Sequence, residues 1–124
     1  MWLRLVGTTP APEVPSQDFG FTILGNEEAV GRAMFDELCR YADEKDGDIT
    51  IVLLGGRGGQ AMYRHIAKLA GGSEIDALLA RLNVITQDAL APLSMNSSLS
   101  FVRDFERLLG ETFFAKIKLS LIHI

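Results

Sequence analysis

Four glycines around one arginine form the part of this chain best suited to bind a ligand. They are Gly55, Gly56, Gly58 and Gly59, with Arg57 between them, and residues 55–59 are called the glycine loop below. A strand-forming run, ITIVLL, precedes the loop, and a helical pattern follows it. Backbone N–H groups at the start of a helix point outward at the positive end of the helix dipole, where phosphate binds. The loop therefore predicts a site for a phosphorylated small molecule, with Arg57 available for a bidentate contact.

The glycine loop does not match the common nucleotide-binding fingerprints. A P-loop requires a lysine followed by a hydroxyl residue, and both are missing here. A G-x-G-x-x-G match begun at Gly56 fails at Ala61, where the third glycine would stand. The acidic residue that this fingerprint also needs is met only weakly by Glu74 or Asp76, and no strand precedes it. A flexible turn without a ligand is the alternative interpretation of the loop.

Asp88 is the candidate catalytic residue. It follows a second predicted strand, residues 82–86, and ligands of open α/β sheets bind beyond the carboxyl ends of the strands. If the two strands are neighbours, the glycine loop and Asp88 face the same crevice. A carboxylate there can act as a general base that moves a proton between a sugar carbon and an oxygen. Its alternative role is to form a turn, which is common for aspartate after a strand.

Two other reactive side chains are interpreted as structural. His65 has no partner carboxylate at helical spacing, so we expect a surface residue. Cys39 lies next to the apolar face of a predicted helix and is expected to be a core or boundary residue, not a nucleophile. The acidic turn at residues 43–48 lacks the glutamate that a calcium loop carries at its twelfth position, where Leu54 stands. The sequence therefore predicts no metal site and no cofactor.

The elements that must position these residues begin with a strand and a long helix. A short strand is expected at residues 19–24, and a helix at 27–44 with Asn26 as its N-cap. The next strand occupies residues 49–54. Helical spacing predicts that the long helix is buried through one apolar stripe, made of Val30, Met34, Leu38 and Tyr41.

Helices and strands then continue to alternate. A helix at residues 60–70, ended by Gly71-Gly72, and a short helical stretch at 74–80 lead into the strand at 82–86. A last helix is expected at 98–115, with caps from Asn96-Ser97-Ser98 and a strong apolar stripe: Phe101, Val102, Phe105, Leu108, Leu109 and Phe113. This alternation predicts an α/β fold, a Rossmann-like open parallel sheet with flanking helices and right-handed crossovers.

Composition limits the class of protein. The chain has 124 residues, enough for one domain, and its net charge of −4 with no basic stripe opposes nucleic-acid binding. No apolar run reaches the length of a membrane span, and the apolar start is too short for a secretory signal. A single cysteine fits a reducing compartment. We therefore expect a cytoplasmic protein.

The order of these motifs resembles the glucosamine-6-phosphate deaminase and 6-phosphogluconolactonase family. The strand ending Leu-Leu-Gly-Gly, with Met62-Tyr63 one helical turn on, is similar to the family's sugar-phosphate loop and the helix after it. The segment VITQDA, residues 84–89, looks like the family's strand that ends in Asp-Glu. Ser100-Phe101 resembles its Ser-Tyr, at the start of a helix that closes on Phe113-Phe114. The similarity spans residues 21–114.

The resemblance implies roles for particular residues. It assigns Gly55, Gly56, Arg57 and Gly58 to the sugar-phosphate loop, and Gly59 stands where the family has proline. It assigns Asp88 to the acid–base carboxylate used in ring opening and enolisation. The family's hydroxyl residues are replaced by Arg57 and Gly58, and the second acid of Asp-Glu is Ala89. These departures leave isomerisation, deamination, lactone hydrolysis and a divergent, non-enzymatic role open.

The family's later Gly-x-Gly-x-Asp-Gly-His segment has no counterpart in this chain. We therefore expect an incomplete domain, residues 1–118, that corresponds to the N-terminal half of the sugar-phosphate isomerase-like fold and is itself inactive. Such a half leaves a sheet edge unpaired, which predicts poor stability or aggregation. Residues 119–124, LSLIHI, read like the translation of a sequencing-library transposon end, and we interpret them as a library scar. A short apolar strand is the alternative.

Three hypotheses for function follow. The first is a sugar-phosphate isomerase, deaminase or lactonase whose partner molecule is a phosphorylated sugar, with homo-oligomerisation of the complete protein left open. The second is a sensor of the same fold that binds a sugar phosphate without turnover, which the change to Ala89 would allow. The third is an unrelated Rossmann-like domain.

Overall fold

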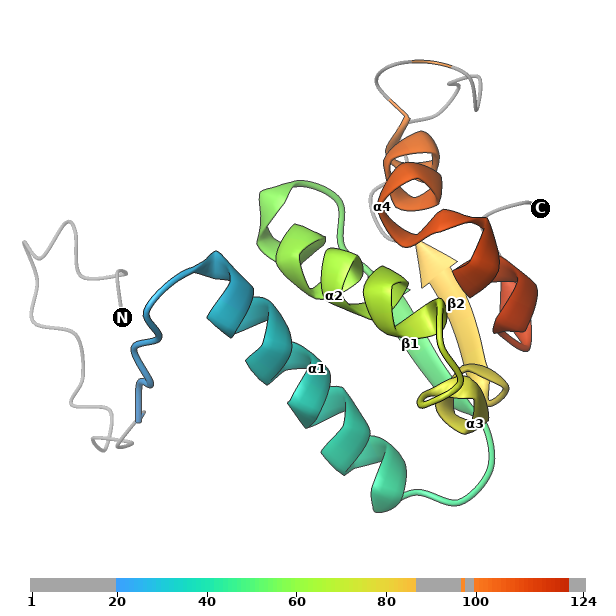
Figure 1. Ribbon diagram of the computed structural model, residues 1–124, viewed down its shortest axis with the longest axis horizontal. Helices are drawn as coiled ribbons and strands as arrows, with labels where there is room; N and C mark the ends of the chain where they lie inside the picture. Colours follow the sequence, from blue (N-terminus) through green and yellow to red (C-terminus); the bar gives the residue numbers. More distant parts are fainter. Residues whose placement is uncertain (1–19, 87–96, 98–99, 121–124) are drawn as a thin grey trace, which may run out of the picture.

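The computed structural model describes residues 20–86, 97 and 100–120. Two long helices and a strand begin this part of the chain, with α1 at Glu27–Asp43, β1 at Ile49–Leu53 and α2 at Gln60–Ala70. A short 3-10 turn, η2 at Arg57–Gly59, leads directly into α2. The remaining elements are α3 at Asp76–Leu79, β2 at Leu82–Thr86, α4 at Phe101–Lys116 and β3 at Leu119–Ser120. The expected alternation of helices and strands is therefore present (Figure 1).

The three strands form one small parallel sheet in the order β1-β2-β3. Ile49 pairs with Leu82 and Leu53 with Thr86, so β1 and β2 end at the same edge of the sheet. Asn83 pairs with Leu119, which places the first residue of β3 beside β2. Leu119 and Ser120 thus form a short strand, the alternative interpretation of residues 119–124, and residues 121–124 lie outside the described residues.

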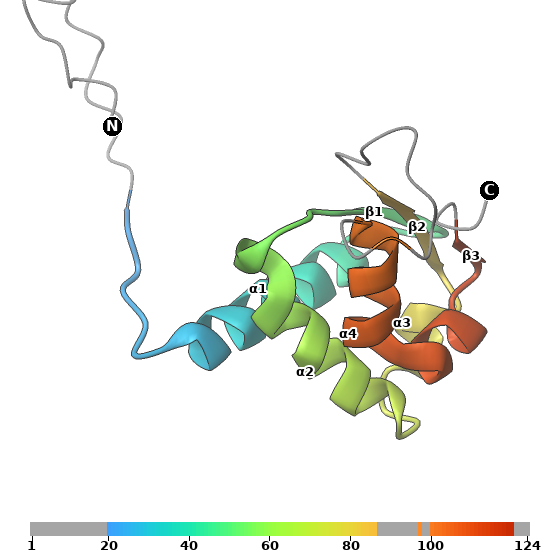
Figure 2. The ribbon, with the colours of Figure 1, turned by 90° about the horizontal axis from the view of Figure 1, so that it is seen from above.

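All the described helices lie on one face of this sheet (Figure 2). Crossovers of one hand that step in one direction across a sheet place their helices on the same face. Here the steps from β1 to β2 and from β2 to β3 share a direction. The other face carries the exposed side chains of Val52 and Leu54, so coverage of both faces is not seen among the described residues.

The core lies between the sheet and the helix layer. The alternate residues Ile49 and Leu53 of β1, with Leu82 and Val84 of β2, point toward the helices and are buried. The helices contribute a set of large buried side chains, listed here: Phe35, Met62, Tyr63, Ile66, Leu79, Phe105, Leu109 and Phe113. The apolar stripe expected on the last helix is therefore confirmed, with Phe101, Val102 and Leu108 packed partly buried against it.

The buried face of α1 differs from the one expected. Gly31, Phe35 and Ala42 are buried, whereas Val30 and Tyr41 are exposed. The reason is the contact with α2, because a Cβ added to Gly31 would lie 2.5 Å from the carbonyl carbon of Ala61. This close approach of two backbones turns α1 so that its glycine faces α2. The helix ends and the N-cap are as expected, with the Asn26 side chain accepting a hydrogen bond from the Ala29 N–H at 2.8 Å.

Two other expectations need correction. Residues 20–24 form no strand in the structure, and Phe21 and Ile23 are exposed because this segment pairs with none of the described strands. The last helix begins at Phe101, with Ser100 as N-cap, instead of at residue 98; Asn96 and Ser98 lie outside the described residues. Gly110 interrupts that helix with φ of 77°, a left-handed conformation that favours glycine.

Candidate functional site

The glycine loop lies where sequence reasoning expected it, at the carboxyl end of β1 and the start of α2. It leaves β1 after Leu53, and residues 57–59 form the single turn η2 before α2 begins at Gln60. The neighbouring strand β2 ends at Thr86, the residue paired with Leu53. The chain that leads to Asp88 therefore starts at the same edge of the sheet as the loop. Asp88 itself lies outside the described residues.

Three of the four loop glycines have a role in the fold. A Cβ on Gly55 would lie 3.0 Å from the ring of Phe101 at the start of α4. A Cβ on Gly59 would lie 2.6 Å from the phenol oxygen of Tyr63. Gly56 has φ of 83°, which L side chains rarely adopt. Packing and backbone conformation thus explain these three glycines without any ligand.

Gly58 is the exception. Apart from its chain neighbours, a Cβ added to it would meet no atom of the described residues within 4 Å, and its φ is not in the left-handed region. The fold as described therefore places no requirement for glycine at this position. A glycine that leaves the backbone bare beside a helix start is what close approach of a ligand requires.

The loop also presents backbone donors. The N–H groups of Gly56, Arg57 and Gly58 precede the first turn of α2 and donate to no carbonyl among the described residues. The first N–H groups of a helix have no acceptor inside it and are satisfied by caps, water or ligands. Neither η2 nor α2 has a side-chain cap at its start. These donors are consistent with an anion site at the positive end of the helix.

Tyr63 supports the loop, a role that sequence reasoning missed. Its hydroxyl accepts a hydrogen bond from the Leu54 N–H at 2.9 Å and donates one to the Leu54 carbonyl at 3.0 Å. The side chain is only 2% exposed and packs edge-on against Phe105. Burial raises the pKa of the Tyr63 phenol, and the hydrogen bond from Leu54 lowers it to a smaller extent. The available signal was a tyrosine four residues after Gly59, one helical turn into α2.

Arg57 is held by the first turn of α1. Its Nε and Nη2 atoms contact Oε1 of Glu27 at 2.9 and 2.8 Å, and its side chain is 84% exposed. A second pair, Arg64 of α2 with Glu28, lies at 2.8 Å. Exposed ion pairs of this kind are worth only about 0–1 kcal/mol. Arg57 is therefore free to exchange Glu27 for an anionic ligand at small cost.

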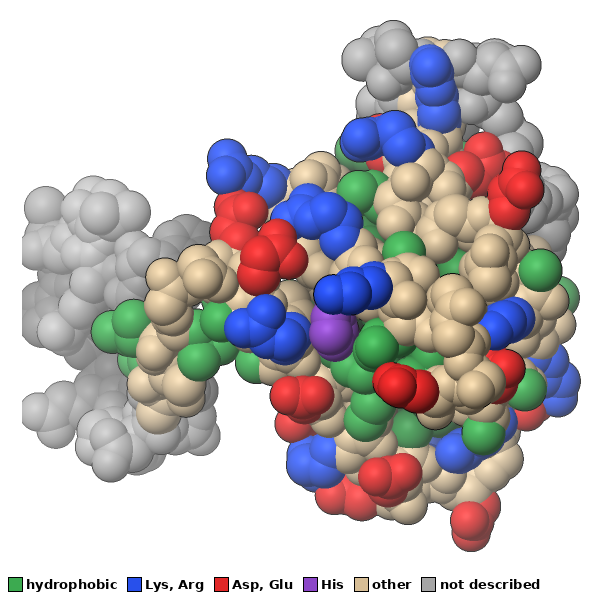
Figure 3. Space-filling view, viewed as in Figure 1, with side chains coloured by type: hydrophobic (Ala, Val, Ile, Leu, Met, Phe, Trp, Pro, Cys, Tyr) green, Lys and Arg blue, Asp and Glu red, His purple; other side chains and the backbone are tan. Residues whose placement is uncertain are grey.

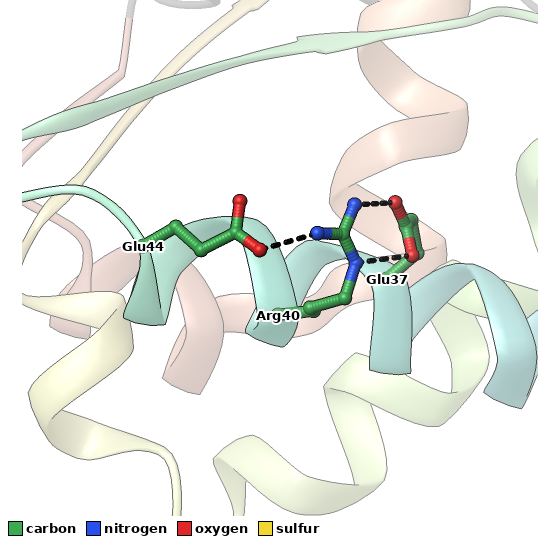
Figure 4. Close-up of polar contacts among 3 residues, drawn as sticks. All are labelled: Glu37, Arg40 and Glu44. Carbon is green, nitrogen blue, oxygen red and sulfur yellow. Dashed lines mark hydrogen bonds and ion pairs between the residues drawn. The ribbon is translucent and has the colours of Figure 1, made fainter.

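Charges of both signs mix over the face that carries α1 and α2 (Figure 3). On the solvent side of α1, Arg40 lies between Glu37 and Glu44, and its Nη1 contacts Oε1 of Glu44 at 2.5 Å (Figure 4). Hydrogen bonding from Arg40 lowers the pKa of the Glu37 carboxyl. These exposed pairs support the helix.

Cys39 has the structural surroundings expected of it, whereas His65 is not the surface residue that was expected. His65 packs edge-on against Phe35, with ring centroids 5.3 Å apart, and is half-buried, not fully on the surface. Cys39 is half-buried at the edge of the core. Burial, aided by the carboxylates of Asp36 and Asp43, raises the pKa of its thiol. A thiol with a raised pKa is a weak nucleophile.

Two shallow hollows of the described surface lie away from the glycine loop. One runs along α4 between Arg103 and Phe114. The other lies between α1 and α3, where Arg81 donates to the carbonyls of Gly47 at 2.6 Å and Ala42 at 3.2 Å. Within residues 20–86, 97 and 100–120, histidine, cysteine and carboxylate side chains form no group able to hold a metal ion.

No family model matches the chain, and comparisons with curated proteins and with solved structures found no match. In the described part of the chain, no helix has the length and apolar character needed to span a membrane. The fold therefore defines this protein as a mixed α/β domain with a small parallel sheet.

Proposed function

We propose that the glycine loop binds the phosphate group of a sugar phosphate. The proposal rests on the unsatisfied donors of the loop. The N–H groups of Gly56, Arg57 and Gly58 lack acceptors among the described residues. Gly58 also leaves the backbone open to a ligand, although the described fold does not require glycine there. The positive end of α2 and the Arg57 guanidinium add to the attraction for a dianion.

In this proposal the complete protein is a sugar-phosphate isomerase, deaminase or lactonase, and Asp88 moves the proton. The fold is the N-terminal half of a Rossmann-like, sugar-phosphate isomerase-like sheet. The parallel pairing of β1 and β2 supports this, because it starts the Asp88 segment at the same edge as the loop. Proton transfer by a carboxylate next to a bound sugar phosphate is the chemistry that such a pair of strand ends can perform.

The proposal is tested by titrating the protein with matched phosphorylated and unphosphorylated sugars. Glucosamine-6-phosphate and 6-phosphogluconate should shift the amide NMR signals of residues 56–60, with a dissociation constant of about 1 mM or below, equivalent to about 4 kcal/mol or more. Glucosamine and gluconate serve as controls and should leave those signals unchanged. Equal shifts with both kinds of sugar, or none with either, would contradict phosphate binding by the loop.

Turnover separates the enzyme from a sensor of the same fold. Ligand binding without conversion of either sugar phosphate by the complete protein would assign the sensor role. Conversion that Asp88→Asn reduces by at least about 100-fold, with binding retained, would assign the acid–base role to Asp88.

A further inference from the structure

Three helices, α1, α2 and α4, lie over the three strands, although the two crossovers between those strands need only α2 and α4. Helix α1 packs against α2, and α2 packs against α4, so the helices follow the order α1, α2, α4 (Figure 1). The strands follow the order β1, β2, β3, and the helices α2 and α4 belong to the crossovers between them. Helix α1 has no preceding strand among the described elements. A strand on the free edge of β1 would complete the same βαβ pattern.

Helix α1 also runs in the direction that such a unit requires. Its first turn lies beside the carboxyl end of β1, because Glu27 contacts Arg57 at 2.8 Å. It ends at Asp43, and residues 44–48 return the chain to the start of β1. A parallel strand before α1 would therefore have to end near Glu27. Residues 21–24 end two positions before Asn26, the N-cap of α1.

Part of the apolar stripe expected on α1 is left uncovered by the described residues, because Met34 and Leu38 pack against the core whereas Val30 and Tyr41 are exposed. At 3.6 residues per turn, Val30, Met34 and Tyr41 fall on the same side of the helix as Glu27, which faces the loop after β1. Val30 is 42% exposed and Tyr41 is 52% exposed. This stripe is the one that the sequence pattern predicts to be buried.

Residues 21–24, called the strap below, carry the complementary apolar surface. Phe21 is 82% exposed and Ile23 is 95% exposed, and Figure 2 shows this segment extending away from the helices. Phe21 and Ile23 alternate, so an extended strap presents both on one face. Burial of apolar surface contributes about 25 cal/mol per Å², which favours covering both surfaces together.

We infer that the free edge of β1 and the uncovered part of the α1 stripe form a docking site for the strap. The strap binds as a fourth, parallel strand, with Ile23 against Val30 and Phe21 further along α1. Its backbone satisfies the outward N–H and C=O groups of β1, which are exposed on an edge strand. Docking also fixes the start of α1, and with it Glu27, beside the glycine loop. The inference does not depend on the proposed ligand.

Disulfide trapping tests the contact directly. In a Cys39→Ser background, the pair Ile23→Cys with Val30→Cys should form an intramolecular disulfide, because docking brings the two Cβ atoms to about 4 Å. The control pair, Ile23→Cys with Arg32→Cys, places the second thiol on another side of α1 and should react at least tenfold more slowly. Equal rates for the two pairs would overturn the inference. Covalent dimers in place of the intramolecular bond would overturn it too, by showing that a second copy is the occupant.

Amide hydrogen exchange gives an independent readout in the full chain. Proline cannot donate a ladder hydrogen bond, so Ile23→Pro should release the strap and speed exchange in β1 at least tenfold, with the far-UV circular dichroism unchanged. Gly20→Ala, just before the strap, is the control and should leave exchange in β1 as it is. Unchanged exchange in Ile23→Pro would contradict docking.

Discussion

At the scale of single residues, Tyr63 is the side chain that fixes the start of the glycine loop. Its hydroxyl bridges the N–H and the carbonyl of Leu54, the residue immediately before Gly55. Its ring fills the space that a side chain at position 59 would need. The glycine at 59 and the tyrosine at 63 thus depend on each other, and the loop geometry follows from that pair.

Tyr63→Phe should lower the free energy of unfolding by about 1–2 kcal/mol. The change leaves two backbone groups of Leu54 without their partner, and an unsatisfied, partly buried group costs about 1–3 kcal/mol. Urea unfolding followed by circular dichroism measures the loss. The control is Tyr41→Phe, since Tyr41 is exposed and should change stability by less than about 0.5 kcal/mol. Equal effects of the two substitutions would contradict the bridging role.

The raised pKa of the Tyr63 phenol gives a prediction for alkaline pH. Below the ordinary value of 10.0, the phenol is protonated in both states and its contribution to stability is complete. Above it, the unfolded chain loses this proton before the folded protein does, so unfolding becomes more favourable as pH rises. The stability difference between wild type and Tyr63→Phe should therefore be smaller at pH 10.5 than at pH 8. Urea titrations at both pH values check this, and a constant difference would oppose it.

At the scale of elements, the contact between α1 and α2 depends on Gly31. A Cβ there would lie 2.5 Å from the carbonyl carbon of Ala61 and 2.7 Å from the nitrogen of Met62, both backbone atoms that cannot turn away. In an exposed helix, glycine to alanine gains about 1 kcal/mol. Here the clash outweighs that gain.

Gly31→Ala should therefore destabilise the protein by about 1–3 kcal/mol, the usual cost of overpacking. Thermal or urea unfolding gives the value. Gly72→Ala is the matched control, because its Cβ would meet only the Leu69 carbonyl at an ordinary 3.6 Å. If Gly31→Ala were as stable as wild type, α1 would not pack on α2 as described.

The helices and strands show which parts of the fold can be predicted from the sequence. Helical and strand periodicity predicted α1, α2, β1 and β2 to within a residue, because those patterns are local. The face of α1 was wrong, because apolar spacing cannot anticipate that Gly31 lets two backbones meet. The left-handed conformation of Gly110, which kinks α4, was also missed. The apolar spacing of Phe105, Leu109 and Phe113 continues across the kink and gives no sign of it. At the candidate site, the sequence predicted where the glycine loop lies. It could not predict which of the four glycines are needed for packing or backbone conformation, because those roles depend on contacts made in the fold.

At the scale of the whole molecule, the described residues cover the sheet on one face only (Figure 2). Parallel sheets are normally covered on both faces, and Val52 and Leu54 are exposed on the open one. The register places Val52 beside Ile85, which extends the apolar area onto β2. We therefore expect self-association at high concentration to use this open face.

Val52→Lys should reduce self-association at high concentration while stability changes by less than about 0.5 kcal/mol, as is usual for an exposed position. Light scattering against concentration measures the first, and urea unfolding the second. Ile51→Lys is the comparison, because Ile51 faces the helices on the same strand and a lysine there should destabilise the fold strongly. Unchanged association of Val52→Lys would mean that the open face is not the contact.

The measurement that tests the central claim most directly compares Gly58→Asp with Gly58→Asn in binding glucosamine-6-phosphate. The two side chains have the same size, and a Cβ at this position meets no atom of the described residues within 4 Å apart from its chain neighbours, so both variants should fold as wild type does. Only aspartate places a negative charge beside the loop N–H groups. Phosphate binding by the loop predicts affinity at least tenfold weaker in Gly58→Asp than in Gly58→Asn, equivalent to about 1.4 kcal/mol. Equal affinities in the two variants would contradict it.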